Sequence, residues 1–140
     1  MKQTDKHALL DWEKYRQDIM RSTPVDKEMG VADREKHRIY LETHPIEWIE
    51  YFFPNYAKYE FADFQKRAIR RMIAHEEWYE VLSWSRELAK STITMFVVMY
   101  LTLTGKKRNV ILTSNSKDNA IRLLDPYRGN LEANGRIIAY

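Results

Sequence analysis

The segment from Ser91 to Leu103 limits the possible folds of this chain most, because it is apolar almost all round. Its length and composition predict a helix. A helix with no polar face needs other elements around it, so we expect this one to be buried. Gly105 follows shortly afterwards and is typical of a helix C-terminus. At 140 residues, the chain has the size of one domain.

The residues just before this helix have the chemistry of a phosphate-binding loop. Trp84 to Thr92 reads Trp-Ser-Arg-Glu-Leu-Ala-Lys-Ser-Thr. In the pattern G-x-x-x-x-G-K-[ST], glycines let the backbone approach the phosphates, Lys reaches the β- and γ-phosphates, and Ser or Thr holds Mg²⁺. Lys90 and Ser91 match the last two positions, whereas Trp84 and Ala89 replace the glycines. The Cβ of Ala89 would destabilise the loop by on the order of 1 kcal/mol if this residue has to adopt a left-handed backbone conformation.

Two short apolar runs flank the loop and the helix. Residues 79–84 are rich in aromatic and β-branched side chains, and residues 109–113 form a second such run. Strand, helix, strand is the βαβ unit on which phosphate loops lie. The expected fold class is therefore α/β, a partial P-loop NTPase with a deviant Walker A loop. The alternative is a buried helix whose first-turn Lys90 is merely solvated.

The loop resembles the ATPase domain of large terminase subunits, the DNA-packaging motors of tailed bacteriophages. The similarity rests on Trp84 to Thr92, with Arg86 in the early part of the loop. Upstream, Phe61-Ala62-Asp63-Phe64-Gln65 is similar to the adenine-recognition element of that family. Downstream, residues 114–140 are similar to the segment after the second strand. The resemblance covers roughly residues 40 to 140.

This resemblance implies a site for ATP and Mg²⁺. Lys90 and Arg86 would be the catalytic residues, and Ser91 would bind the metal. The residues expected to contact the nucleotide are Gln65, Ser85, Arg86, Glu87, Leu88, Ala89, Lys90, Ser91 and Thr92. Two roles have plain structural alternatives. Gln65 could lie at the edge of a packed helix, and Arg86 could pair with Glu87.

The resemblance also implies a function and partners. The full-length protein would be an ATPase that packages double-stranded viral DNA into procapsids, in the cytoplasm of the bacterial host. Its partners would be the portal protein and the small terminase subunit, with a ring oligomer on the portal. Whether this chain alone is an enzyme stays open. A superfamily-2 helicase-like ATPase fragment and a non-catalytic helical DNA-binding or interaction module are the alternatives.

Two regions are expected along the chain. Residues 1–58 predict a helical extension, with helices over 5–20, 24–41 and 45–53; Thr23 and Pro24 are the N-cap and first residue of the second. Residues 59–140 would form the first part of the ATPase domain. No apolar run ending in Asp-Glu follows 109–113, so the domain is expected to stop before Walker B, without the family's nuclease.

The second region begins with the clearest helical periodicity, over residues 61–73. Near its end, residues 114–116 form a cap cluster, and a helix is expected over 117–124. Asp125-Pro126 are either a break or the start of a new helix, residues 127–134 continue as helix, and Gly135 ends it.

Charge and composition narrow the partners. Residues 81–140 contain 9 basic and 4 acidic residues, which suits a polyphosphate or DNA, whereas residues 1–80 contain 14 and 16. There is no cysteine, so no disulfide framework or cysteine metal site is expected. The apolar run Ile93 to Leu103 is too short to span a bilayer, and we expect no membrane partner.

Overall fold

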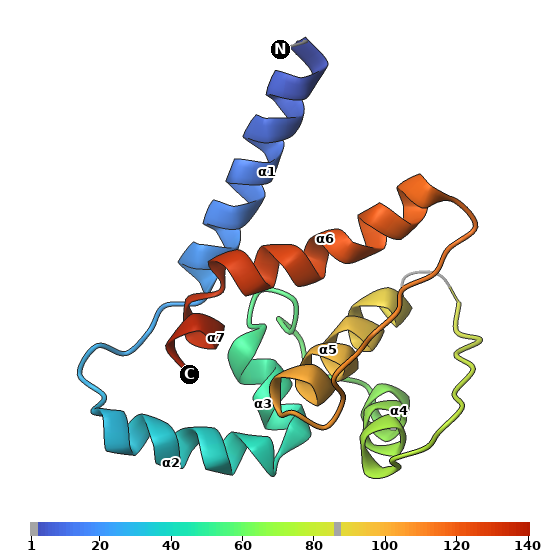
Figure 1. Cartoon of the computed structure of the whole chain (residues 1–140). Coiled ribbons are helices and arrows are strands. Elements are labelled where there is room, and N and C mark those ends of the chain that lie inside the picture. The colour runs from blue at the N-terminus through green and yellow to red at the C-terminus, as the bar shows by residue number, and fades with distance from the viewer. Residues whose placement is uncertain (1–2, 86–87) are drawn as a thin grey trace.

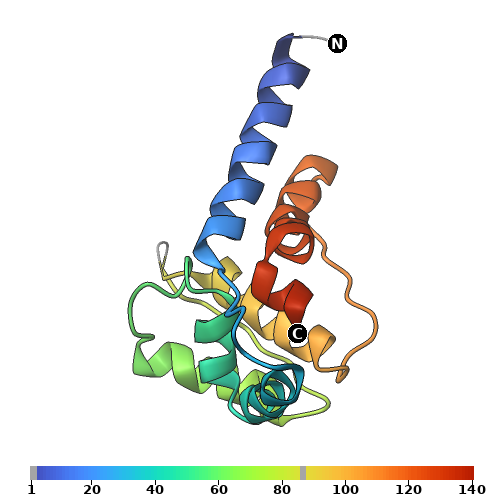
Figure 2. The same ribbon diagram turned by 90° about the vertical axis from the view of Figure 1, so that its left-hand side faces the viewer.

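The computed structural model describes residues 3–85 and 88–140, and it folds them into seven helices without a β-strand. In chain order these are α1 (Gln3–Ser22), α2 (Val31–Glu42), α3 (Pro45–Phe52), α4 (Asp63–Ala74), α5 (Lys90–Leu103), α6 (Lys117–Ala133) and α7 (Gly135–Ala139). The first half of α1 projects away from the other helices (Figures 1 and 2).

Helix α5 lies at the centre of the molecule, as its apolar composition predicts. It packs against α3, α4 and α6 (Figure 1). Six of its residues are buried: Ile93, Met95, Phe96, Val97, Met99 and Tyr100. The prediction of a buried helix over this segment is confirmed.

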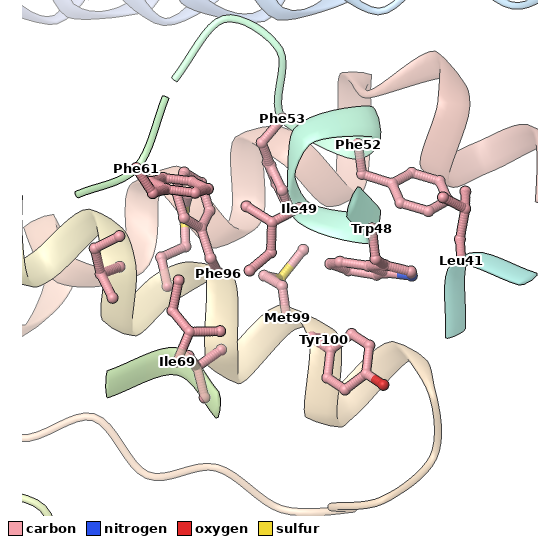
Figure 3. Packing of buried hydrophobic residues seen from close by; sticks show 13 residues of the cluster. Leu41, Trp48, Ile49, Phe52, Phe53, Phe61, Ile69, Phe96, Met99 and Tyr100 are labelled. Atoms are coloured by element: carbon pink, nitrogen blue, oxygen red, sulfur yellow. The ribbon is translucent and has the colours of Figure 1, made fainter. Parts of the chain in front are cut away.

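Aromatic side chains form much of the core around α5. Phe96 packs against Phe53 and Phe61, with ring centroids 5.2 and 5.9 Å apart, and Figure 3 shows the three rings together. Trp48 of α3 meets Tyr100 edge to face at 5.2 Å. These offset and perpendicular arrangements are the favourable ones for aromatic rings. The buried Tyr100 hydroxyl donates to the Glu42 carbonyl, so it is not left without a partner.

The α/β fold with a βαβ unit, expected from the sequence, is wrong for the described residues. Residues 79–84 and 109–113 have no regular secondary structure, and no backbone hydrogen bond joins the two. Strands are stable when a neighbour pairs with their backbone and one face is buried. The first condition fails here, because no backbone hydrogen bond pairs either segment with a neighbour among the described residues, and Tyr79 and Ile111 are 90% and 86% exposed. Both segments run as connections, one before α5 in the chain and one after it (Figure 1).

The N-terminal region is helical as predicted, but one boundary differs. A helix over 5–20 is confirmed by α1, whereas α2 begins at Val31 and not at Pro24. Thr23 does not start a helix. Its hydroxyl donates to the Ile19 carbonyl at 2.8 Å and accepts from the Gly135 N–H at 3.1 Å. Thr23 therefore joins the end of α1 to α7, a contact that local sequence patterns cannot reveal.

Helices α3 and α4 match their predictions. Pro45 occupies the first turn of α3, where its missing N–H has no cost. Helix α4 begins at Asp63 and buries Ala68 and Ile69 from its predicted apolar face.

Helix α6 differs from its prediction at Pro126. The break or new helix start expected there is wrong, because one helix continues from Lys117 to Ala133. At its start, the predicted cap is present as the Ser116 hydroxyl, which accepts from the Asn119 N–H at 3.3 Å. At its end, Asn134 follows the last residue and caps α7 by accepting from the Ile137 N–H. Gly135 therefore begins α7.

The helices formed by residues 3–85 and 88–140 include none with both the length and the apolar character that crossing a bilayer needs.

Candidate functional site

A cavity of about 620 Å³ opens at the N-terminus of α5. Its walls come from the first turns of α5, from α6, and from the two extended connections that precede and follow α5 in the chain. Polar and aromatic residues that border it include Glu80, Lys90, Ser91, Thr92, Arg122 and Tyr127. Leu82 and Leu112 from the connections also line it. The segments that were expected to flank a phosphate loop thus meet around one cavity, although they do not pair as strands.

The turn that leads into α5 has a left-handed residue. Ala89 has φ 58° and ψ 33°, a conformation that favours glycine, and it is the only non-glycine residue with positive φ among those described. The phosphate-loop pattern has glycine at this position. The Cβ of alanine makes this conformation unfavourable by about 1–2 kcal/mol. Ala89 thus adopts the left-handed backbone conformation that is typical of glycine.

The first turn of α5 offers backbone donors to the cavity. No side chain caps this helix, and its hydrogen-bond ladder starts with the Ile93 N–H, which donates to the Ala89 carbonyl at 2.8 Å. The earlier N–H groups have no partner within the helix, and the helix dipole puts partial positive charge there. Lys90, Ser91 and Thr92 border the cavity at this turn. These are the features that bind anions.

The charged side chains around the cavity favour an anion. Lys90 comes from α5 and Arg122 from α6, and neither forms an ion pair within residues 3–85 and 88–140. The acid at the cavity, Glu80, is already paired, because Arg71 donates to it at 2.6 Å. Hydrogen bonds from Arg71 and then Trp78 hold the pKa of Glu80 below its usual range. Its charge is therefore compensated outside the cavity.

Gln65 lies beside the loop but not at the cavity. Its Oε1 accepts from the Ala62 N–H at 2.9 Å, and its Nε2 donates to the Leu88 carbonyl at 3.2 Å. The side chain thus joins the start of α4 to the turn before α5. Each end of the amide keeps capacity for a further hydrogen bond, because its oxygen has a second lone pair and its nitrogen a second N–H.

The structure separates the predicted nucleotide contacts into three groups. Lys90, Ser91 and Thr92 border the cavity. Ser85, Leu88, Ala89 and Gln65 belong to the turn or to its support. Arg86 and Glu87 lie outside the described residues, so their predicted roles stay predictions.

Arg122 and Tyr127 are site residues that the sequence did not single out. Together with Leu123 and Pro126 they border the cavity from one face of α6. The excess of basic residues in the second half of the chain includes Arg122 and is a weak signal for it. Nothing in the local pattern indicates that α6 passes across the N-terminus of α5.

Magnesium would have one protein ligand here. The hydroxyl of Ser91 is exposed at the cavity and fits an ion whose other ligands are nucleotide phosphates and water, a common arrangement for Mg²⁺. In the described part of the chain, no group of three or more His, Asp or Glu side chains is placed to hold a metal.

No family model, curated protein or solved structure matches this chain. The resemblance to terminases therefore stays a prediction from the residues Trp84 to Thr92 and the segments around them. Geometry and charge at the N-terminus of α5 therefore decide which function the site favours.

Proposed function

We propose that this chain binds the phosphates of ATP, with Mg²⁺, at the N-terminus of α5, as the ATP-binding part of a terminase large subunit. The observation that carries this function is the placement of Lys90, Ser91 and Thr92 on the first turn of α5, bordering the cavity. Phosphate binding uses the turn and the cavity, whereas the terminase role rests on the resemblance alone.

Three properties of the turn support phosphate binding. The left-handed Ala89 directs the chain into α5 with uncapped N–H groups. Lys90 adds a full positive charge, which forms strong charge-assisted hydrogen bonds with phosphate oxygens. The Ser91 hydroxyl supplies an oxygen ligand for Mg²⁺, whose charge offsets that of the phosphates when it is bound.

The wider role follows from the resemblance. In the whole protein, ATP hydrolysis would drive double-stranded viral DNA into a procapsid in the cytoplasm of the bacterial host. The portal protein and the small terminase subunit would be its partners in a ring oligomer. Arg86, which lies outside the described residues, would stabilise charge on the transferred phosphate, and Gln65 would read the adenine.

A second candidate is a non-catalytic helical interaction module. The observation that favours it is the fold, since the described residues form helices and no sheet. In that case Lys90 and Ser91 would simply be exposed residues of a helix start, and the cavity would bind no nucleotide. A superfamily-2 helicase-like ATPase would share the phosphate chemistry of the first candidate.

Nucleotide titration distinguishes ATP binding from the non-catalytic interaction module. We expect Mg²⁺-ATP to bind the chain in isothermal titration calorimetry, and Lys90→Ala to weaken that binding by about tenfold or more, because a charge-assisted contact is lost. Lys36→Ala removes an exposed charge from α2, away from the cavity, and is expected to bind as the wild type does. Equal affinity of the wild type and Lys90→Ala would contradict the proposed site.

A further inference from the structure

Arg122 is the second basic residue at the cavity, and it comes from a different helix than Lys90. It belongs to the N-terminal part of α6, which packs against α5. Leu123, Pro126 and Tyr127 follow it on the same side of α6 and border the cavity too. Arg122 and Lys90 are therefore on two walls of one space, although 32 positions separate them in the sequence.

The surroundings of Arg122 leave its charge available to a ligand. It is exposed, and within the described residues it donates no side-chain hydrogen bond and forms no ion pair. Two other arginines of the second half, Arg128 and Arg136, are engaged. Arg128 pairs with Glu132 at 2.8 Å, and Arg136 donates to the Tyr51 carbonyl at 2.7 Å. Glu80, the acid at the cavity, is held by Arg71.

We infer that Arg122 is a second phosphate-binding residue of this cavity, and that the site selects anions with a chain of phosphates long enough to contact both Arg122 and Lys90. This inference rests on the proposed function and makes it more specific. A single phosphate at the first turn of α5 has Lys90 and the helix N–H groups as partners. A triphosphate can extend from that turn to α6 and gain the second cation.

The physical reason is the separation of the two charges on two elements. Two cations facing one space repel each other weakly until an anion lies between them, and a bridging anion then interacts with both. Arginine suits this role because its planar guanidinium can donate two parallel hydrogen bonds to phosphate oxygens. The cavity should therefore bind longer phosphate chains more tightly, whatever base is attached.

The test measures chain-length preference by calorimetry, with orthophosphate, tripolyphosphate and Mg²⁺-ATP as probes. We expect the wild type to prefer tripolyphosphate to orthophosphate. Arg122→Ala should lower the affinity for tripolyphosphate and ATP by about tenfold, and it should change the affinity for orthophosphate by less than about twofold. The affinity of Arg122→Lys for tripolyphosphate and ATP should lie between those of the wild type and of Arg122→Ala. Lys117→Ala removes a charge from the same helix without touching the cavity, and should behave as the wild type does.

The possible results separate this inference from the proposed function. If Arg122→Ala keeps wild-type affinity for tripolyphosphate and ATP while Lys90→Ala loses it, Arg122 has no role and the proposed function stands. If Lys117→Ala weakens binding as much as Arg122→Ala, the effect is one of net charge, and the inference is wrong. If the wild type binds none of the three probes, the proposed function fails, and the inference fails with it.

Discussion

At the scale of the residue, Ala89 is the most informative position. Its left-handed backbone is one that alanine adopts at a cost, and it immediately precedes the turn carrying Lys90 and Ser91. A residue held in such a conformation marks a place where the surrounding structure imposes the backbone. The turn into α5 is therefore maintained by the fold, with Gln65 bonded to Leu88 as one of its supports.

Ala89→Gly should stabilise the protein. Removing the Cβ relieves the left-handed strain of about 1–2 kcal/mol, and the greater freedom of glycine in the unfolded chain offsets part of this gain. We expect the free energy of unfolding in urea to rise by about 0.5–1 kcal/mol.

Ala120→Gly, inside α6, is the matched control for this change. Its backbone is helical, so the same substitution should lower the free energy of unfolding by about 1 kcal/mol. Destabilisation by Ala89→Gly would show that alanine at position 89 is not strained.

At the scale of the element, the crossing of α1 and α6 depends on a glycine. A Cβ built on Gly129 would lie 2.6 Å from Tyr15 Cε1 and 3.2 Å from Ile19 Cδ1. Gly129 therefore lets α6 approach α1 closely. The same helix carries Arg122 toward the cavity at its other end, so its placement affects both the N-terminal helix and the candidate site.

Gly129→Ala should destabilise the protein through this contact. Overpacking costs about 1–3 kcal/mol, and the better helix propensity of alanine returns about 1 kcal/mol. We expect a net loss of about 1–2 kcal/mol in urea unfolding.

A double-mutant cycle with Tyr15→Ala tests the cause. In that background the added methyl group meets no ring, so Gly129→Ala should cost much less than in the wild type. If Gly129→Ala destabilises the Tyr15→Ala variant as much as the wild type, the contact with Tyr15 is not the source of the strain.

At the scale of the whole molecule, tyrosine hydroxyls join distant parts of the chain. Tyr15 of α1 bonds with Tyr56 at 2.7 Å. The Tyr140 hydroxyl contacts His37 Nδ1 at 2.6 Å and accepts from Tyr51 at 2.9 Å. Burial, and then the hydrogen bond with the neighbouring tyrosine, raises the pKa of both Tyr15 and Tyr140 above the usual value of 10.0. The folded state therefore holds these two protons more strongly than the unfolded state.

This difference predicts loss of stability at alkaline pH. The stabilisation is complete below the unfolded pKa of about 10, and it falls as the pH rises above 10, because the unfolded tyrosines then release protons that the folded ones retain. Urea unfolding followed between pH 8 and 12 should show this decline.

Tyr15→Phe should make the decline shallower, although it also removes a hydrogen bond and lowers stability at neutral pH by about 1 kcal/mol. Tyr79→Phe is the control, since Tyr79 is 90% exposed. A pH dependence of Tyr15→Phe identical to that of the wild type would rule out Tyr15 as a source.

The sequence alone determined the features that depend on neighbours along the chain. The apolar run at 91–103 required a buried helix, Pro45 and the periodicity of residues 61–73 located α3 and α4, and Lys90 with Ser91 fell at a helix start. These results follow because helix formation depends on residues three or four positions apart.

Only the tertiary structure decided how distant segments meet. Residues 79–84 and 109–113 have strand composition, yet a strand needs a neighbour that pairs with its backbone, and neither segment has one among the described residues. The position of Arg122 across the cavity from Lys90 likewise depends on the packing of α6 on α5. Long-range packing controls both outcomes, and for that reason local patterns located the turn of the candidate site but not its opposite wall.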